Sequence, residues 1–188
     1  MISMLQELWS YIKNPNYTED ANQDFSYRFR TLVVLIALSI MASIVFGLTI
    51  AAFEGLFQLD LGKHTIDDLV ENYPPVYLFL GAVVLAPVLE ELLFRGPMIF
   101  FKRKSYFPII YYALTLIFGF YHITNFEITT TIILMSPLLV SPQLFVGSAL
   151  GFIRVRFGLL WAIGLHALYN LLLVGPILLL KVLNIPLE

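Results

Sequence analysis

Long apolar stretches limit what this chain can fold into more than any other feature of its sequence. Residues 31–53 are almost uninterrupted aliphatic, and further apolar stretches cover about residues 76–101, 106–122, 128–153 and 159–180. A helix rises roughly 1.5 Å per residue, so about 20 residues cross a hydrocarbon core of about 30 Å. The sequence therefore predicts an all-α fold, a polytopic transmembrane helix bundle with about five spans.

The composition supports a membrane protein and excludes several classes of function. Hydrophobic residues make up 59% of the chain and charged residues 13%, whereas a soluble domain has about half and about a quarter. The small net charge of −2 argues against nucleic acid as a partner. The apolar composition makes the lipid bilayer the expected surrounding of the chain. The chain has no cysteine, which excludes disulfides, thiol catalysis and cysteine-ligated metals.

Basic residues orient the predicted spans. They fall in the N-terminal segment or in connections that would share its side of the membrane: Lys13, Arg28, Arg30, Lys102, Arg103, Lys104, Arg154 and Arg156. The alternate connections are acidic and carry one base, Lys63. Because basic loops stay in the cytoplasm, we expect a multi-pass integral membrane protein with its N-terminus in the cytoplasm and its C-terminus outside.

The chain divides into an N-terminal segment and one membrane domain. Apolar residues recur at helical spacing between Leu5 and Ile12, which predicts a short amphipathic helix on the membrane surface or on the protein itself. We assign residues 1–30 to an N-terminal cytoplasmic amphipathic segment and residues 31–188 to the transmembrane helical domain. Short connections without a Ser/Gly-rich linker support a single domain.

Two local signals refine this layout. Pro137 and Pro142 interrupt the fourth apolar stretch, which predicts a crossing made of broken or kinked helical pieces. In the polar region after the first span, Thr65 and Asp68 have the spacing of a capping pair, which predicts a short surface helix. His64 precedes this helix in a charged loop, and we expect it to be an ordinary surface residue.

The stretch "APVLEELLFRGPMIFF", residues 86–101, places three charges inside an apolar span. Glu91 and Arg95 are four residues apart and share a helical face, with the acid first, which is the favourable order for an ion pair. Glu90 points about 100° away from Glu91. A buried carboxylate without a partner is costly and tends to take up a proton, so Glu90 is a candidate acid or base.

Two histidines and an asparagine on later spans are candidate partners for Glu90. His122 ends the third apolar stretch, and His166 lies in the last one with Asn170 one helical turn later. A carboxylate can deprotonate a water, imidazoles can hold that water or a metal ion, and an amide can donate to an oxyanion. These residue types indicate peptide hydrolysis. Counted from the basic clusters, His122 lies about eight residues deeper than Glu90 and His166. A tilt of its helix, or a start of that helix below the membrane surface, would bring it level with them.

Three motifs in order make the chain resemble the CPBP family, the CAAX-protease and bacteriocin-processing (Abi-type) intramembrane endopeptidases. "EELLFR" matches Glu-Glu-x-x-x-Arg, "FGFYH" matches Phe-x-x-x-His, and "HALYN" matches His-x-x-x-Asn. Each pattern alone is weak, but all three lie in order on hydrophobic segments. The similarity covers a core of about residues 76–175.

The resemblance implies a function and a role for each polar residue of the core. It implies an intramembrane endopeptidase that hydrolyses a peptide bond of a membrane-embedded or membrane-associated protein or peptide with glutamate/histidine-activated water. The implied roles are Glu90 to activate water, His122 and His166 as its partners in the site, Asn170 as oxyanion donor, and Glu91 with Arg95 as support. The family also contains bacteriocin-maturation and self-immunity proteins and members with scaffold roles.

Two alternatives stay open at this point. A non-catalytic membrane protein, such as an immunity factor, a scaffold or a small transporter, would keep the same cluster for packing or proton movement. Glu90, His122 and His166 could also bind zinc as a two-histidine, one-carboxylate set. The sequence has no "HExxH", and a ligating Glu90 would be less available as a base, so we prefer a metal-free glutamate mechanism over a zinc one.

Overall fold

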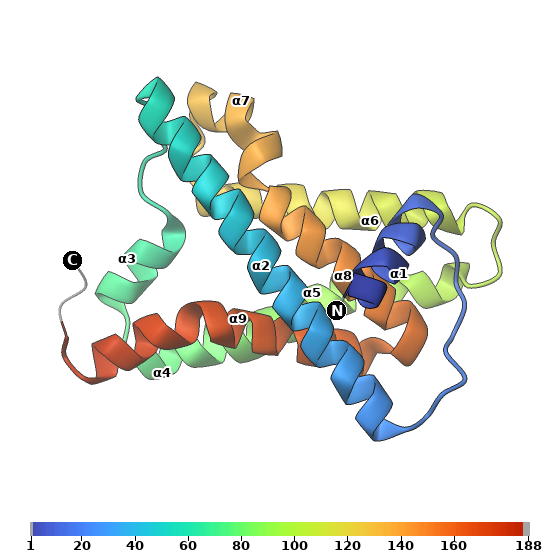
Figure 1. Cartoon of the computed structure of the whole chain (residues 1–188). Helices are drawn as coiled ribbons and strands as arrows, with labels where there is room; N and C mark the ends of the chain where they lie inside the picture. Colours follow the sequence, from blue (N-terminus) through green and yellow to red (C-terminus); the bar gives the residue numbers. More distant parts are fainter. Residues whose placement is uncertain (1, 186–188) are drawn as a thin grey trace.

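A computed structural model describes residues 2–185, which form a bundle of helices joined by loops (Figure 1). The α-helices are α1 (Ile2–Lys13), α2 (Phe25–Phe57), α3 (Thr65–Asn72), α4 (Pro75–Leu78), α5 (Ala86–Phe94), α6 (Phe107–Tyr121), α7 (Thr130–Leu139), α8 (Ser141–Phe157) and α9 (Leu159–Val182). A π-helix, Phe79–Leu85, joins α4 to α5, and 3₁₀ turns follow α5 (Gly96–Phe101) and α6 (His122–Asn125). The predicted all-α fold is confirmed for residues 2–185, where no named strand occurs.

The spans agree with those expected from the sequence. Four helical stretches are long and apolar enough to cross a membrane: Phe25–Phe57, Pro75–Phe101, Phe107–Asn125 and Leu159–Val182. α7 and α8 make a fifth span if they are counted together, with a bend of 40° between them. The bend falls between Pro137 and Pro142, as predicted. Pro142 lies in the first turn of α8, where its missing N–H removes no helical hydrogen bond.

α8 lies inside the bundle and packs against α2, α6 and α9. Its residues are buried without interruption from Val146 to Val155. Two glycines allow this close packing, because a Cβ on Gly151 would lie 2.6 Å from the Tyr111 ring and one on Gly147 would lie 3.1 Å from the Arg95 guanidinium. Small residues let helices approach closely in membranes, and here they let α6 and Arg95, which follows α5, approach α8.

The N-terminal segment is fastened to one end of α8. α1 packs against α2 and α8 and buries Leu8 completely. Arg156, near the end of α8, pairs with Glu7 of α1 at 2.7 Å and with Asp20 of the following loop at 2.5 Å. The segment therefore covers the same end of the bundle that carries the basic residues of α8.

The start of α3 corrects one sequence prediction. The capping pair is His64 with Asp67, and not Thr65 with Asp68. Nδ1 of His64 accepts a backbone N–H of the first turn at 3.1 Å, and the His64 amide donates to Asp67 at 3.2 Å. The Thr65 hydroxyl instead donates to the Asn125 carbonyl at 3.0 Å. A neutral imidazole nitrogen accepts a hydrogen bond as a threonine hydroxyl would, which explains why the cap begins one residue earlier.

The orientation in the membrane is testable with single cysteines. We predict that residues 102–104 and 154–156 lie on the cytoplasmic side and that His64 and Glu127 lie outside, because basic connections are retained in the cytoplasm. The chain has no native cysteine, so Lys63→Cys and Lys104→Cys each report one position without background. In intact cells an impermeant thiol reagent should label the first variant, and should label the second only after permeabilisation. Labelling of both variants from one side would refute this topology.

Candidate active site

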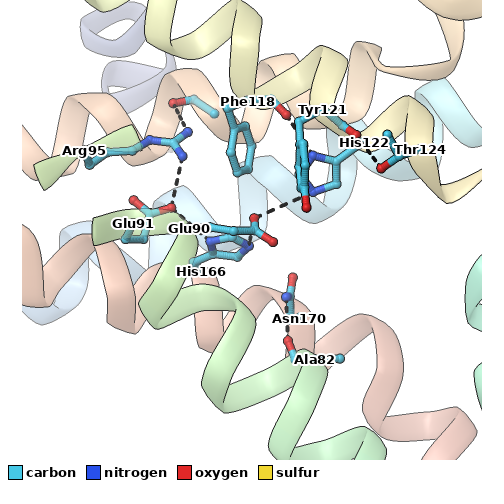
Figure 2. A network of polar contacts seen from close by, with 11 residues as sticks. Ala82, Glu90, Glu91, Arg95, Phe118, Tyr121, His122, Thr124, His166 and Asn170 are labelled. Carbon is cyan, nitrogen blue, oxygen red and sulfur yellow. Dashed lines mark hydrogen bonds and ion pairs between the residues drawn. The ribbon is translucent and has the colours of Figure 1, made fainter. Parts of the chain in front are cut away.

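Glu91 is the centre of a fully buried polar network (Figure 2). Its Oε1 accepts a hydrogen bond from Nη1 of Arg95 at 3.1 Å and another from Nδ1 of His166 at 2.9 Å. The ion pair predicted from the four-residue spacing is therefore present, and both of its side chains are fully buried. Because His166 comes from α9, the network joins α5 to α9.

Arg95, directly after α5, extends this network to two more helices. Its Nη2 donates to the Gly147 carbonyl of α8 at 3.2 Å. Its guanidinium carbon lies 3.9 Å from the ring centroid of Phe118 in α6, where the negative face of the ring attracts a cation. One buried arginine thus holds together the three helices α5, α6 and α8.

Glu90 points away from this network, toward two imidazole rings (Figure 2). Its Oε2 lies 3.8 Å from Nε2 of His122 and 3.9 Å from Nε2 of His166. These separations are too long for direct hydrogen bonds and are of the size that a bridging water spans. Among the described residues, Oε2 of Glu90 is a buried atom without a hydrogen-bond partner.

The second nitrogen of each ring indicates how the imidazoles are protonated. Nδ1 of His122 lies 2.8 Å from the Phe118 carbonyl, and Nδ1 of His166 lies 2.9 Å from the Glu91 carboxylate. A carbonyl and an ionised carboxylate only accept hydrogen bonds, so we assign a proton to Nδ1 of both rings. In the neutral form of each ring, Nε2 then carries a lone pair that faces Glu90. Three acceptors converge, which favours a hydrogen-bond donor such as water between them.

Glu90, His122 and His166 are also the possible zinc ligands named in the sequence analysis. Within residues 2–185, no three or more His, Cys, Asp or Glu side chains are arranged to hold a metal ion. We derive the chemistry of the site from the side chains alone, following the metal-free mechanism that the sequence analysis prefers.

His122 lies at the junction of α6 and the 3₁₀ turn His122–Asn125. Residue counting along the chain places it deeper in the membrane than Glu90, yet the two side chains face each other. α6 runs obliquely to α2 (Figure 1), so the two helices are not both parallel to the membrane normal, and a residue count along one helix does not give depth directly.

Asn170 lies one turn after His166 in α9. Its Nδ2 donates to the Ala82 carbonyl at 2.8 Å, so the amide nitrogen faces the π-helix (Figure 2). An amide nitrogen carries two hydrogens. One N–H and the amide oxygen therefore stay available to a ligand.

A cavity of about 670 Å³ has this polar cluster in its wall. Glu90, His122, His166 and Asn170 all line it. Apolar and aromatic side chains extend it beneath α3 and along α9, among them Ile66, Leu69, Tyr73, Tyr77, Leu173, Val174 and Ile177. The volume lies in the range of ligand-binding pockets, about 300–1,000 Å³. The cavity thus has a polar end at Glu90 and an apolar end at α3.

Two further residues of the cavity wall are missed by the sequence reasoning. His64 is not an ordinary surface residue, because it lines the cavity and packs edge-on against Phe126 with ring centroids 4.8 Å apart. Gln143 of α8 also lines the cavity, and its Oε1 is buried without a partner among the described residues. An amide within an apolar stretch is a signal that could have identified Gln143. No local sequence pattern predicts the contact between His64 and Phe126.

The fold and the cluster define a class of protein: a multi-pass helical membrane protein with a buried glutamate–histidine site that faces a cavity. The sequence model of the family described as type II CAAX prenyl endopeptidase Rce1-like matches residues 72–172, more than half of the chain. The chain therefore belongs to the Rce1-like family, within the CPBP family that its motifs indicate. No curated protein and no solved structure gives a significant match.

Replacing Glu91 should chiefly reduce stability. Glu91→Gln keeps the size of the side chain but leaves Arg95 buried without its counter-charge, and breaking a buried pair in this way costs about 3 to 5 kcal/mol. Thermal or chemical unfolding in detergent measures the loss. Glu127→Gln changes an exposed side chain and should unfold like the wild type. A Glu91→Gln variant as stable as this control would show that the pair does not hold the fold.

The cap of α3 should respond to pH. Burial lowers the pKa of His64, Asp67 opposes this shift and His122 adds to it, so the pKa lies below its ordinary value. A lowered folded-state pKa means that the cap stabilises α3 fully above about pH 6.5 and is lost as the pH falls through the folded-state value. Protonation consumes the Nδ1 lone pair that accepts the helix N–H.

Hydrogen exchange at residues 66–68 checks this prediction. Protection of these amides, corrected for the intrinsic exchange rate, should fall between about pH 7 and pH 5 because a protonated imidazole cannot cap. His64→Asn caps without titrating and should show no such loss. Wild-type protection that stays constant over this range would rule out the histidine cap as a pH-sensitive contact.

Proposed function

We propose that this protein is an intramembrane endopeptidase that hydrolyses a peptide bond of a membrane-associated or membrane-embedded protein or peptide. The observation that carries the proposal is the approach of Glu90 Oε2 to Nε2 of His122 and of His166, at 3.8 Å and 3.9 Å, in the wall of a cavity. Membership of a family described as type II CAAX prenyl endopeptidases supports the same activity.

Water bound between Glu90 and the two imidazoles is the proposed nucleophile. The Glu90 carboxylate takes one proton from this water while the water oxygen attacks the carbonyl carbon of the peptide bond. A tetrahedral intermediate with a negatively charged oxygen results. The protonated Glu90 then gives its proton to the amine nitrogen as the C–N bond breaks. The products are a carboxylic acid and an amine, and no covalent bond to the enzyme forms.

The other polar side chains orient the water and stabilise charge. The water donates one hydrogen to Glu90 and the other to Nε2 of His122 or of His166, which holds it against Glu90. The free N–H of Asn170 donates to the oxyanion, an interaction whose loss typically costs about 10²–10³ in kcat. Glu91 keeps the proton of His166 on Nδ1, as a carboxylate behind a catalytic histidine does, and Arg95 supplies the counter-charge of Glu91.

The substrate is proposed from the shape of the cavity and the family description. The apolar end beneath α3 suits a hydrophobic part of the substrate, while the peptide bond lies at Glu90. A peptide with a prenylated cysteine near its C-terminus combines these two parts and is the first substrate class to test. Such a lipidated peptide partitions into the bilayer, where the spans that line the cavity around Glu90 are proposed to lie.

Replacing Glu90 should abolish cleavage and leave the fold intact. Glu90→Gln keeps size and hydrogen bonding but removes the basic carboxylate, so turnover should fall by about 10²–10⁴. Purified protein in lipid vesicles is incubated with prenylated and unprenylated membrane-anchored peptides, and mass spectrometry identifies the products. Thermal unfolding of the same preparations checks the fold.

Glu127→Gln is the matched control and should cleave like the wild type, because its side chain is exposed and does not line the cavity. Near-normal turnover by Glu90→Gln would remove Glu90 from the mechanism. If no tested peptide is cleaved by the wild type, the non-catalytic alternative gains support.

A further inference from the structure

The π-helix Phe79–Leu85 and the proline that follows it leave one backbone carbonyl without a helical donor. In the π register the Ala86 amide donates to the Gly81 carbonyl, five residues back. The same register would direct the next amide to the Ala82 carbonyl, but residue 87 is proline and has no N–H. The Ala82 carbonyl therefore lacks a donor from its own helix.

An ordinary α register would place the free carbonyl elsewhere. In that case the Ala86 amide would donate to Ala82, four residues back, and Pro87 would leave the Val83 carbonyl free instead. Val83 is rotated by about 100° around the helix axis from Ala82. The π register and Pro87 are both needed to free the carbonyl of Ala82 in particular.

The donor that reaches this carbonyl is Asn170. Its Nδ2 lies 2.8 Å from the Ala82 oxygen, across the contact between the π-helix and α9. A carbonyl only accepts hydrogen bonds, so it selects the nitrogen end of the amide and turns the oxygen end the other way. Figure 2 shows this arrangement, with the amide oxygen of Asn170 on the side of Glu90 and His166. The bond to Ala82 also fixes the plane of the amide and so the direction of its second N–H, the one proposed to donate to the oxyanion.

We propose that Pro87, through the π-helical register that frees the Ala82 carbonyl, is a positioning residue for Asn170 and fixes the orientation of its amide in the active site. The proposal rests on the proposed peptidase activity and adds a residue that lies outside the Glu-Glu-x-x-x-Arg, Phe-x-x-x-His and His-x-x-x-Asn motifs. Pro87 touches no reacting atom in this mechanism. It acts because its backbone nitrogen has no hydrogen to donate to the Ala82 carbonyl.

Pro87→Ala tests the proposal because it supplies the missing N–H. In a retained π register the new amide donates to Ala82, and in a restored α register the Ala86 amide does so. Either way a backbone donor competes with Asn170. We expect kcat to fall about tenfold with KM nearly unchanged, a fraction of the 10²–10³ that loss of an oxyanion donor costs. Thermal stability should stay level or rise, because a proline has been removed from a helix.

A double-substitution cycle separates positioning from general structure. In an Asn170→Ala background, adding Pro87→Ala should change kcat less than twofold, because residues that act through one another are not additive. If the two effects multiply instead, Pro87 does not act through Asn170 and the proposal is wrong. Pro137→Ala, a helical proline that does not line the cavity, is the matched control and should keep the wild-type kcat.

A second measurement needs no variant of Pro87. With ¹⁵N-labelled asparagine, one side-chain amide proton of Asn170 in the wild type should exchange slowly with solvent because it is bonded to Ala82, and Asn170→Ala identifies the signal by its loss. Rapid exchange of both protons would overturn the proposal even if Pro87→Ala failed to fold.

The outcome also distinguishes this proposal from the proposed function. If the wild type cleaves peptide and Glu90→Gln does not, the peptidase assignment stands, and a Pro87→Ala variant with full kcat refutes only the positioning role. If the wild type cleaves nothing, the exchange measurement still decides whether Ala82 holds Asn170.

Discussion

The buried carboxylate of Glu91 is the interaction on which the rest of the structure depends. A lone charge in a low-dielectric interior costs several kcal/mol, and Arg95 and His166 offset that cost by donating to one oxygen. Arg95 in turn requires the Gly147 carbonyl and the Phe118 ring, because its own charge must also be satisfied. Four helices, α5, α6, α8 and α9, therefore have to meet at one point, and that point is the wall of the cavity.

Two adjacent glutamates acquire different tasks because successive helical residues point about 100° apart. Glu91 faces Arg95 and Nδ1 of His166, and these two contacts hold its carboxylate in place. Glu90 faces two imidazoles at distances that leave room between the groups. His166 connects them, since its Nδ1 faces Glu91 and its Nε2 faces Glu90. The hydrogen bond to Glu91 therefore fixes the His166 ring, and the fixed ring faces Glu90, the side chain proposed to activate water.

Much of this arrangement could be predicted from the sequence, for reasons that particular residues make plain. Hydrophobic length predicts the spans, Pro137 and Pro142 predict the bend, and the i,i+4 spacing predicts the Glu91–Arg95 pair, because all three are local properties. The family follows from short motifs around Glu90, His122 and His166, whose chemical roles stay predictions. Contacts between distant segments could not be predicted in this way. His64 enters the cavity wall through Phe126, and nothing near residue 64 in the sequence encodes that approach.

The least predictable features are helix irregularities, and these shape the site most directly. In a membrane no water satisfies a backbone group that a helix leaves free, so another part of the protein must do so. Arg154 donates to the Arg95 carbonyl where α5 ends, and Asn170 donates to the Ala82 carbonyl where the π register meets Pro87. Each break in helical hydrogen bonding thus calls for a donor from a neighbouring helix, and that donor is fixed as a result. A proline in a span therefore does more than bend it, because it selects which polar side chain of the next helix is held and which way that side chain faces.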